Sequence, residues 1–267
     1  MIVAIDVGNT KISLGVIKGG DVASARRAST HSLASADDAE RVLGELLAHD
    51  DAKLSDVSET WLVSVVPAAT DAIAEVCQRH SIALTVASAA NVPLPIHVEQ
   101  PRSVGTDRLM DAFAAALLWT PPLIVVDLGT ATTFNAVDPD GAFIGGAIAP
   151  GLGLGLDALA EKTAQLPRVP VTKPAKAVGR DTVSAIMSGA LIGYRGLVRE
   201  VVDAISKEMT TDGAARPKVI LTGGLSSSDW AHTIPGVDAI EPLLTLRGLA
   251  LLKRELMALP KMAGASS

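Results

Sequence analysis

The sequence contains an internal repeat, and this repeat constrains the fold more than any other feature. Residues 2–17 read IVAIDVGNTKISLGVI, and residues 123–138 read LIVVDLGTATTFNAVD. Each copy has an apolar strand, an Asp-x-Gly turn, small hydroxyl or amide residues and a second alternating strand. Because there are only two copies and they lie far apart, they predict two similar α/β halves rather than a solenoid.

Strand and helix patterns alternate around the two copies. Short apolar runs predict further strands at 61–66, 142–149 and 219–221. Apolar spacing predicts helices at 37–49, 70–80, 108–119, 156–162, 182–205 and 244–256. This alternation indicates an α/β fold. We expect one half over residues 1–117, the other over 118–267, and a mobile tail from Pro260.

Composition places the chain among globular proteins and argues against several partners. Apolar residues make up 48% and charged residues 19%, as in domains with a sizeable core. The net charge of -6 argues against nucleic acid as a partner. The apolar helical stretch 109–119 is shorter than the ~20 residues that span a bilayer, so no membrane partner is expected. The only cysteine, Cys77, suits a reducing compartment, and we expect a cytoplasmic protein.

The first copy of the repeat has the residues of a phosphate-binding turn. Asp6 ends an apolar strand, and Gly8, Asn9 and Thr10 follow it. Backbone N–H groups and hydroxyls in such a turn hold phosphate oxygens, while the carboxylate orients a hydrated Mg²⁺. An ordinary β-hairpin is the alternative, because Asp, Gly and Asn are common turn residues. The second copy favours phosphate binding.

The second copy carries three threonines after its Asp-x-Gly turn. Clustered hydroxyls suit a second phosphate cradle, and we predict a functional role for Asp127, Gly129 and Thr130. Thr132 and Thr133 also fit a purely structural role, because threonine is a good strand former.

Two further motifs each allow two interpretations. In Gly105-Thr106-Asp107-Arg108, either Thr106 or Asp107 caps the following helix, or Asp107 is a base beside an anion-binding arginine. In Thr222-Gly223-Gly224, either the glycines let backbone approach a planar ring such as adenine, or they form a plain strand-to-helix turn.

Taken together and in order, the motifs resemble those of type III pantothenate kinases. They are DVGNT at 6–10, VGTDR at 104–108, DLGTATT at 127–133, GGAIAPG at 145–151 and TGGL at 222–225, with LPRV at 166–169 and LTLRGL at 244–249 as further matches. The resemblance runs from Met1 to about Leu256. It implies the actin/hexokinase-like ATPase fold, with two ribonuclease-H-like halves and mixed sheets flanked by helices. The implied reaction is ATP-dependent phosphorylation of pantothenate to 4′-phosphopantothenate, the first step of coenzyme A biosynthesis.

The resemblance also implies roles for single residues. Asp107 would be the general base, Asp6 would position the Mg²⁺ of ATP through water, and Asp127 would bind a monovalent cation, K⁺ or NH₄⁺. The ATP-binding residues would be Asp6, Val7, Gly8, Asn9, Thr10, Lys11, Ile12, Ser13 and Thr130. The substrate-binding residues would be Val98, Gly105, Thr106, Asp107, Arg108 and Thr182. A homodimer is implied as well, and it agrees with the high mean hydropathy.

The sequence departs from the family pattern near the substrate. Val98 stands where many relatives have an aromatic residue, Gln100 replaces an asparagine before proline, and Thr106 replaces a small apolar residue. Two other functions therefore stay open: a kinase for another small hydroxyl acceptor, and a non-catalytic regulatory protein on the same fold. Intact Asp6, Asp107 and Asp127 count against the regulatory protein.

Overall fold

The computed structural model describes residues 1–171, 176–210 and 215–258, which form two compact units. The first unit comprises Met1–Leu94, Gln100–Ala114 and Leu243–Ser267, and the second comprises Pro95–Glu99 and Ala115–Pro242. The tail predicted from Pro260 lies outside the described residues.

The first unit is built on a six-stranded mixed sheet. Its strands are β1 (Ile2–Val7), β2 (Lys11–Lys18), β3 (Asp21–Val22), β4 (Arg26–Ser29), β5 (Glu59–Ser64) and β6 (Ala83–Val86). Their order is β3-β2-β1-β5-β6, and β4 also pairs with β2. The first copy of the repeat is the antiparallel hairpin β1–β2, while β1 pairs with β5 in parallel.

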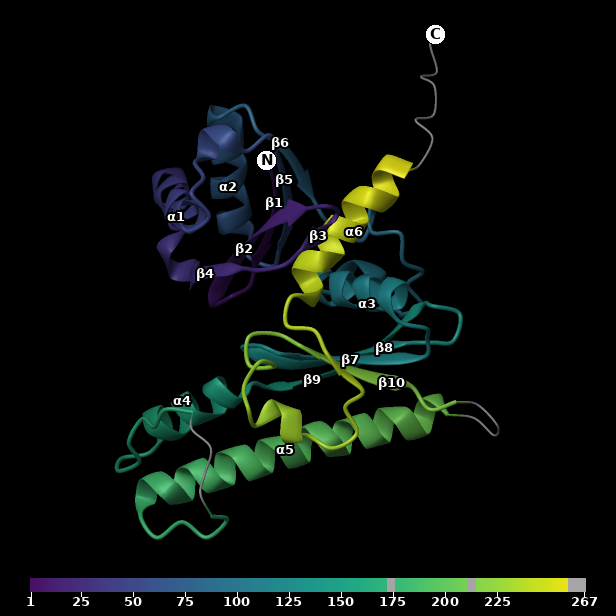
Figure 1. Cartoon of the computed structure of the whole chain (residues 1–267). Coiled ribbons are helices and arrows are strands. Elements are labelled where there is room, and N and C mark those ends of the chain that lie inside the picture. Colours follow the sequence, from purple (N-terminus) through teal and green to yellow (C-terminus); the bar gives the residue numbers. More distant parts are fainter. Residues whose placement is uncertain (172–175, 211–214, 259–267) are drawn as a thin grey trace. The chain divides into compact units, whose positions relative to one another are not determined.

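Helices cover both faces of this sheet (Figure 1). The helices α1 (Ala36–Ala48) and α2 (Pro67–Arg79) share a core cluster with Val3, Ile5 and Leu62. Side chains alternate along a strand, so Trp61 faces the other way, where Lys253 of α6 (Leu244–Ala258) lies 5.8 Å from its ring centroid. The last helix of the chain therefore completes the first unit.

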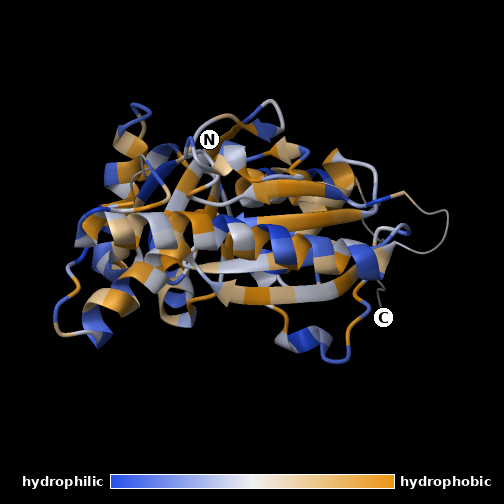
Figure 2. Cartoon of the chain, turned by 90° about the horizontal axis from the view of Figure 1, so that it is seen from below, coloured by the Kyte–Doolittle hydropathy of each residue, from blue (hydrophilic) through white to orange (hydrophobic). Residues whose placement is uncertain are grey.

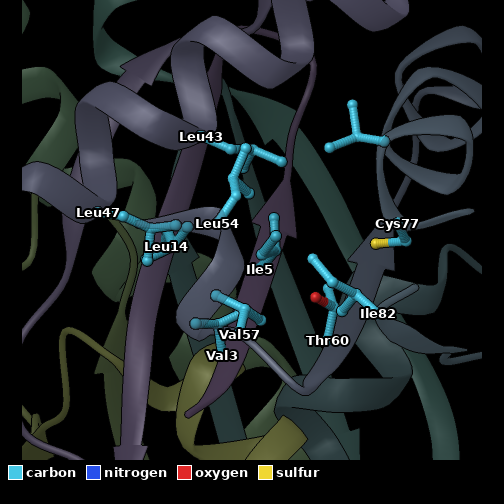
Figure 3. A pocket seen from close by; sticks show the side chains of 11 residues that line it. Val3, Ile5, Leu14, Leu43, Leu47, Leu54, Val57, Thr60, Cys77 and Ile82 are labelled. Carbon is cyan, nitrogen blue, oxygen red and sulfur yellow. The ribbon is translucent and has the colours of Figure 1, made fainter. Parts of the chain in front are cut away.

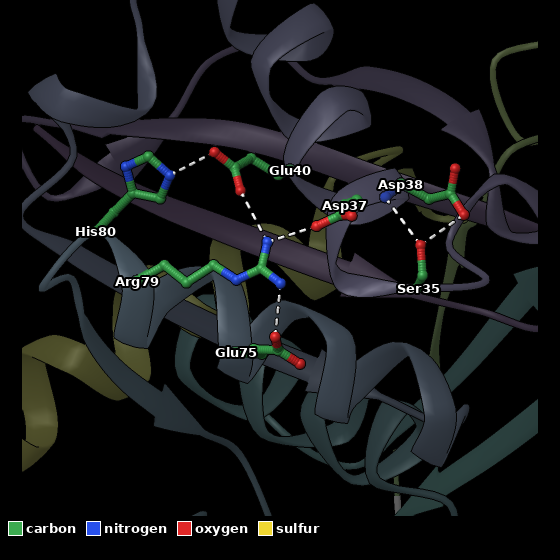
Figure 4. Close-up of polar contacts among 7 residues, drawn as sticks. All are labelled: Ser35, Asp37, Asp38, Glu40, Glu75, Arg79 and His80. Atoms are coloured by element: carbon green, nitrogen blue, oxygen red, sulfur yellow. Dashed lines mark hydrogen bonds and ion pairs between the residues drawn. The ribbon is translucent and has the colours of Figure 1, made fainter.

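Exposed ion pairs join α1 to α2 (Figure 4). Arg79 donates hydrogen bonds of 2.6 Å to both Asp37 of α1 and Glu75 of α2. His80 Nε2 lies 2.7 Å from Glu40 Oε1. Such pairs at the surface orient the helices but contribute little stability individually.

The core of the first unit contains a small cavity of about 10 Å³ (Figure 3). Apolar side chains line it, apart from the hydroxyl of Thr60 and the thiol of Cys77. Burial raises the pKa of the Cys77 thiol, which keeps the thiol protonated. The cavity is a gap in core packing, and its lining lacks the charges that a nucleotide needs.

The second unit repeats the strand arrangement of the first. Its strands are β7 (Leu123–Leu128), β8 (Ala131–Val137), β9 (Phe143–Pro150), β10 (Lys218–Thr222) and β11 (Ala239–Ile240), in the order β11-β10-β7-β8-β9. The second copy of the repeat is the antiparallel hairpin β7–β8, and β7 pairs with β10 in parallel. The Asp-x-Gly motifs thus end equivalent strands.

Helix α5 (Thr182–Met209) packs on the sheet of the second unit, and α4 (Leu152–Lys162) precedes it. The core cluster joins Ile124 and Val126 of β7 to Leu191 and Val198 of α5. Figure 2 shows hydrophilic and hydrophobic residues interleaved along this long helix, as expected when one side packs on a sheet. Helix α3 (Thr106–Leu118) begins in the first unit and ends in the second.

The predicted α/β fold is confirmed, and every predicted helix is present with ends shifted by at most a few residues. The start of α2 was placed too late, because Pro67 occupies its first turn rather than only closing the strand before it. The segment from Leu243 groups with the first unit, since α6 packs on that sheet, whereas the predicted division placed it in 118–267. That division stays a prediction.

Among the residues described, no helix combines the length and the apolar character needed to cross a membrane.

Candidate active site

The loop between β1 and β2 is a tight turn fixed by Thr30. Gly8 N donates to Lys11 O at 3.0 Å, which closes the turn. Thr30 donates from Oγ1 to Gly8 O at 2.7 Å and from its backbone N to Thr10 O at 3.0 Å. Asn9, Thr10 and Lys11 remain exposed. The turn is therefore rigid at its base and open to a ligand at its tip.

The predicted ATP-binding residues of this hairpin differ in which of their groups a ligand can reach. Val7 and Ile12 are buried in the core cluster, so only their backbone groups are available to a ligand. Ser13 lies opposite Asp6 across the hairpin. Sequence reasoning missed Thr30, because it is distant from the motif and nothing local marks it.

The start of α3 brings a carboxylate into the first helical turn. Leu109 N donates to Gly105 O at 3.2 Å, so Gly105 occupies the N-cap position and neither Thr106 nor Asp107 does. Asp107 Oδ1 accepts a 2.8 Å hydrogen bond from Arg108 N. A Cβ on Gly105 would lie 2.5 Å from that oxygen, so only glycine lets the carboxylate fold back onto the turn. The N-cap interpretation of Thr106 or Asp107 is wrong.

Burial shifts the pKa values of Asp107 and Arg108 at this turn. It raises the pKa of the Asp107 carboxyl, and the Arg108 N–H and guanidinium oppose that rise only in part. Burial also lowers the pKa of Arg108, which the charge of Asp107 counteracts. A carboxylate with a raised pKa accepts a proton more readily than an ordinary aspartate, which suits a general base.

In the second unit, the TGGL turn supports the end of β7. Gly223 has a φ of +89°, and a Cβ at this position would collide with Asp127 Oδ1. Thr222 pairs with Asp127 between the parallel strands, and Leu225 N donates to Leu128 O at 3.2 Å. Gly223 therefore lies close to Asp127, whereas a Cβ on Gly224 would meet nothing within 4 Å. The contact to a planar ring stays a prediction.

The GGAIAPG motif supports the same loop from another side. Gly151 N donates to Thr130 O at 3.1 Å, and a Cβ on Gly151 would collide with that oxygen. Three sequence motifs, DLGTATT, APG and TGGL, therefore converge on Asp127, Gly129 and Thr130.

A third support of this loop was not anticipated from the sequence. Thr132 is fully buried, and its Oγ1 lies 2.7 Å from the hydroxyl of Tyr194 on α5. The structural role that stayed open for Thr132 is the one the structure favours. No sequence pattern marks Tyr194, because the pair is 62 residues apart.

The other two predicted substrate residues, Val98 and Thr182, belong to the second unit. Val98 follows a segment that pairs with the start of β9, and its Cγ1 lies 3.8 Å from the Cβ position of Gly145. Thr182 is the first residue of α5 and is exposed, beside the N-cap Asp181.

The two hairpins offer suitable groups for cations. Asp6 and Asp127 end equivalent strands, and both are partly exposed. Each carboxylate is followed by backbone carbonyls and threonine hydroxyls, and such hard oxygen donors suit Mg²⁺ and K⁺. The residues present therefore fit these ions.

The sequence was compared with family models and with solved structures. The model of the type III pantothenate kinase family matches residues 2–204. A putative Baf family transcriptional activator from Campylobacter jejuni has 16% identity and a TM-score of 0.59, covering 96% of this chain and all of that chain. A ROK family glucokinase from Streptomyces griseus has 13% identity and a TM-score of 0.51, covering 95% and 99%. An archaeal actin homologue has 12% identity and a TM-score of 0.50, also covering 95% and 99%. At these identities the solved structures show the fold alone, which is that of actin-like ATPases with two similar halves.

Proposed function

The chain belongs to the type III pantothenate kinase family, and we propose how its own residues carry out the ATP-dependent phosphorylation of pantothenate in coenzyme A biosynthesis. The observation that carries the proposal is the Asp107 carboxylate, which folds back on the first turn of α3 and has a pKa raised by burial. That carboxylate is the general base.

In the reaction, Asp107 accepts the proton of the primary hydroxyl of pantothenate. The alkoxide oxygen forms a bond to the γ-phosphorus of ATP as the bond to the β–γ bridging oxygen breaks, and ADP leaves. Arg108 binds the substrate carboxylate, because a guanidinium pairs well with that group. The pantothenate site comprises Val98, Gly105, Thr106, Asp107, Arg108 and Thr182.

ATP is held by the open turn of the first hairpin and by the loop after β7. Exposed Asn9, Thr10 and Lys11 offer N–H groups, a hydroxyl and a positive charge to phosphate oxygens. The full set comprises Asp6, Val7, Gly8, Asn9, Thr10, Lys11, Ile12, Ser13 and Thr130.

Two cations accompany the substrates. The divalent ion of ATP is Mg²⁺, which Asp6 would hold through water, and a monovalent ion, K⁺ or NH₄⁺, would bind at Asp127. When bound, these ions supply positive charge that balances the phosphate oxygens. Gly223 supports this role, because the absence of a side chain there leaves room for the Asp127 carboxylate.

A homodimer in the cytoplasm is the proposed working form. Apolar side chains exposed on the second unit support the dimer, among them Ile148 at 64%, Leu154 at 50% and Ile192 at 47% exposed. Light scattering after gel filtration tests it, with Ile192→Glu as the variant that should dissociate the pair. A monomer at all concentrations would contradict it.

The kinase assignment is tested by pantothenate-dependent ADP release with Mg²⁺, in K⁺ and in Na⁺ buffers, beside Asp107→Asn. We expect activity in K⁺, a lower rate in Na⁺, and a loss of about 10²- to 10⁴-fold in the variant. Turnover with other hydroxyl acceptors but not with pantothenate would point to a different substrate. An Asp107→Asn enzyme as fast as the unchanged one would remove Asp107 from the role of base.

A further inference from the structure

Tyr194 is the only tyrosine of the chain, and its hydroxyl lies in the interior of the second unit. The hydroxyl is 2.7 Å from Thr132 Oγ1, in the motif DLGTATT. The ring also makes an edge contact with Trp230, at 5.7 Å between centroids and 75° between planes. Packing therefore fixes the ring, and the hydroxyl has one defined direction.

Thr132 connects Tyr194 to a backbone carbonyl group. Thr132 Oγ1 also lies 3.4 Å from the backbone carbonyl of Pro150, which can only accept. Thr132 Oγ1 thus has two hydrogen-bond partners, and in its bond with Tyr194 either hydroxyl can be the donor. This gives a relay from α5 through β8 to the end of β9.

The relay ends where the loop after β7 is held. Thr132 pairs with Leu128 across the hairpin, directly after Asp127. Gly151, which follows Pro150, donates to Thr130 O at 3.1 Å. Thr132 therefore pairs with the residue after Asp127, and the residue after Pro150 is bonded to Thr130.

The electrostatic environment keeps the phenol neutral. Burial raises the pKa of Tyr194 to about 12; the hydrogen bond to Thr132 opposes the rise, and the negative charge of Asp127 adds to it. The phenol is therefore neutral throughout the working range of pH, and the charge of Asp127 contributes to the raised pKa.

We propose that Tyr194 is a positioning residue which, through Thr132, holds the loop of Asp127 and Thr130 in its cation-binding form. The inference rests on the proposed role of Asp127 as the ligand of a monovalent cation. A hydroxyl that only filled space in the core would change stability without changing cation affinity, and this difference can be measured.

The test compares K⁺ binding in Tyr194→Phe, Thr132→Val and the double variant. Phenylalanine keeps the ring and its contact with Trp230 but removes the hydroxyl. One readout is the K⁺ concentration that gives half of the K⁺-specific rise in melting temperature, with choline chloride keeping the ionic strength constant. The other is the K⁺ concentration for half-maximal pantothenate-dependent ADP release.

We expect each single variant to raise both concentrations by about three- to tenfold, the scale of one lost neutral hydrogen bond. The maximal rate at saturating K⁺ should stay near that of the unchanged protein. Because both changes break one relay, the double variant should be no worse than the larger single effect. Thr132→Ser keeps the hydroxyl and should restore the K⁺ response.

Ser188→Ala is the matched control, because it removes another buried hydroxyl of α5, which donates to Ala177 O. It should lower the melting temperature without moving either K⁺ concentration. If Tyr194→Phe behaves like this control, the inference is overturned while the cation site stands. If the unchanged protein shows no K⁺ response in either readout, both the cation site and the inference fail.

Discussion

Thr245 of α6 donates a 2.7 Å hydrogen bond to the buried carboxylate of Asp111, one helical turn after Asp107 on α3. The two residues are 134 positions apart in the chain. The bond connects the LTLRGL motif to the helix that begins with the proposed base, and this gives the motif a physical role.

Replacing Thr245 by valine removes this donor while keeping the shape of the side chain. A buried carboxylate with one donor fewer should lower the free energy of unfolding by about 1–3 kcal/mol. Urea denaturation measures the loss, and Thr245→Ser, which retains the hydroxyl, is the control. Equal stability of the valine and serine variants would show that the hydrogen bond contributes nothing.

The same two helices approach closely at Gly248. A Cβ there would lie 2.8 Å from Met110 Sδ and 3.2 Å from Ala114 Cβ. Gly248→Ala should therefore destabilise the protein by about 1–3 kcal/mol through overpacking. Gly44→Ala in α1 is the matched control: a Cβ there meets nothing within 4 Å, so we expect a gain of about 0.5–1 kcal/mol. The opposite signs should appear in thermal unfolding, and a gain at both positions would refute the close approach.

Asp107→Asn should increase stability at neutral pH although it removes activity. The pKa of Asp107 in the folded protein is raised above the ordinary value of 3.8. Between pH 3.8 and that folded-state pKa, the folded protein therefore binds more protons than the unfolded chain. The contribution of this carboxyl to stability therefore falls as the pH rises through that interval, and it stays unfavourable above it. Melting temperatures measured from acid to neutral pH should show a gain for the variant at neutral pH that shrinks toward pH 3.8. A variant less stable at neutral pH would contradict the raised pKa.

Gly223→Ala should weaken K⁺ activation of the enzyme, by a steric effect that the secondary-structure preference of alanine does not explain. The alanine Cβ would collide with Asp127 Oδ1, and the residue would have to adopt a φ of +89°. We expect the carboxylate to be displaced, with weaker K⁺ activation of ADP release. Gly224→Ala, where a Cβ meets nothing within 4 Å, serves as the comparison for K⁺ activation. Equal K⁺ dependence of both variants would argue against the proposed cation site.

The features predicted well from the sequence are those with a local pattern. The Asp-x-Gly repeat located both hairpins, and apolar periodicity located the helices, because both signals lie within a few neighbouring residues. The contacts of Thr30 with Gly8 and of Tyr194 with Thr132 could not be predicted, since they depend on side chains that only the folded sheet brings together. The place of Gly105 as N-cap was missed because Thr106 and Asp107 are both better-known caps.

The position of α6 on the sheet of the first unit has a consequence for biosynthesis. A ribosome makes the chain from Met1 onward, so β1, β2 and β5 emerge long before α6. All residues of the second unit, up to Pro242, are made before that helix. The side of the nascent sheet that carries Trp61 therefore stays uncovered until α6 has left the exit tunnel. The unit made first is then the one completed last, the reverse of the usual order in which domains fold during synthesis.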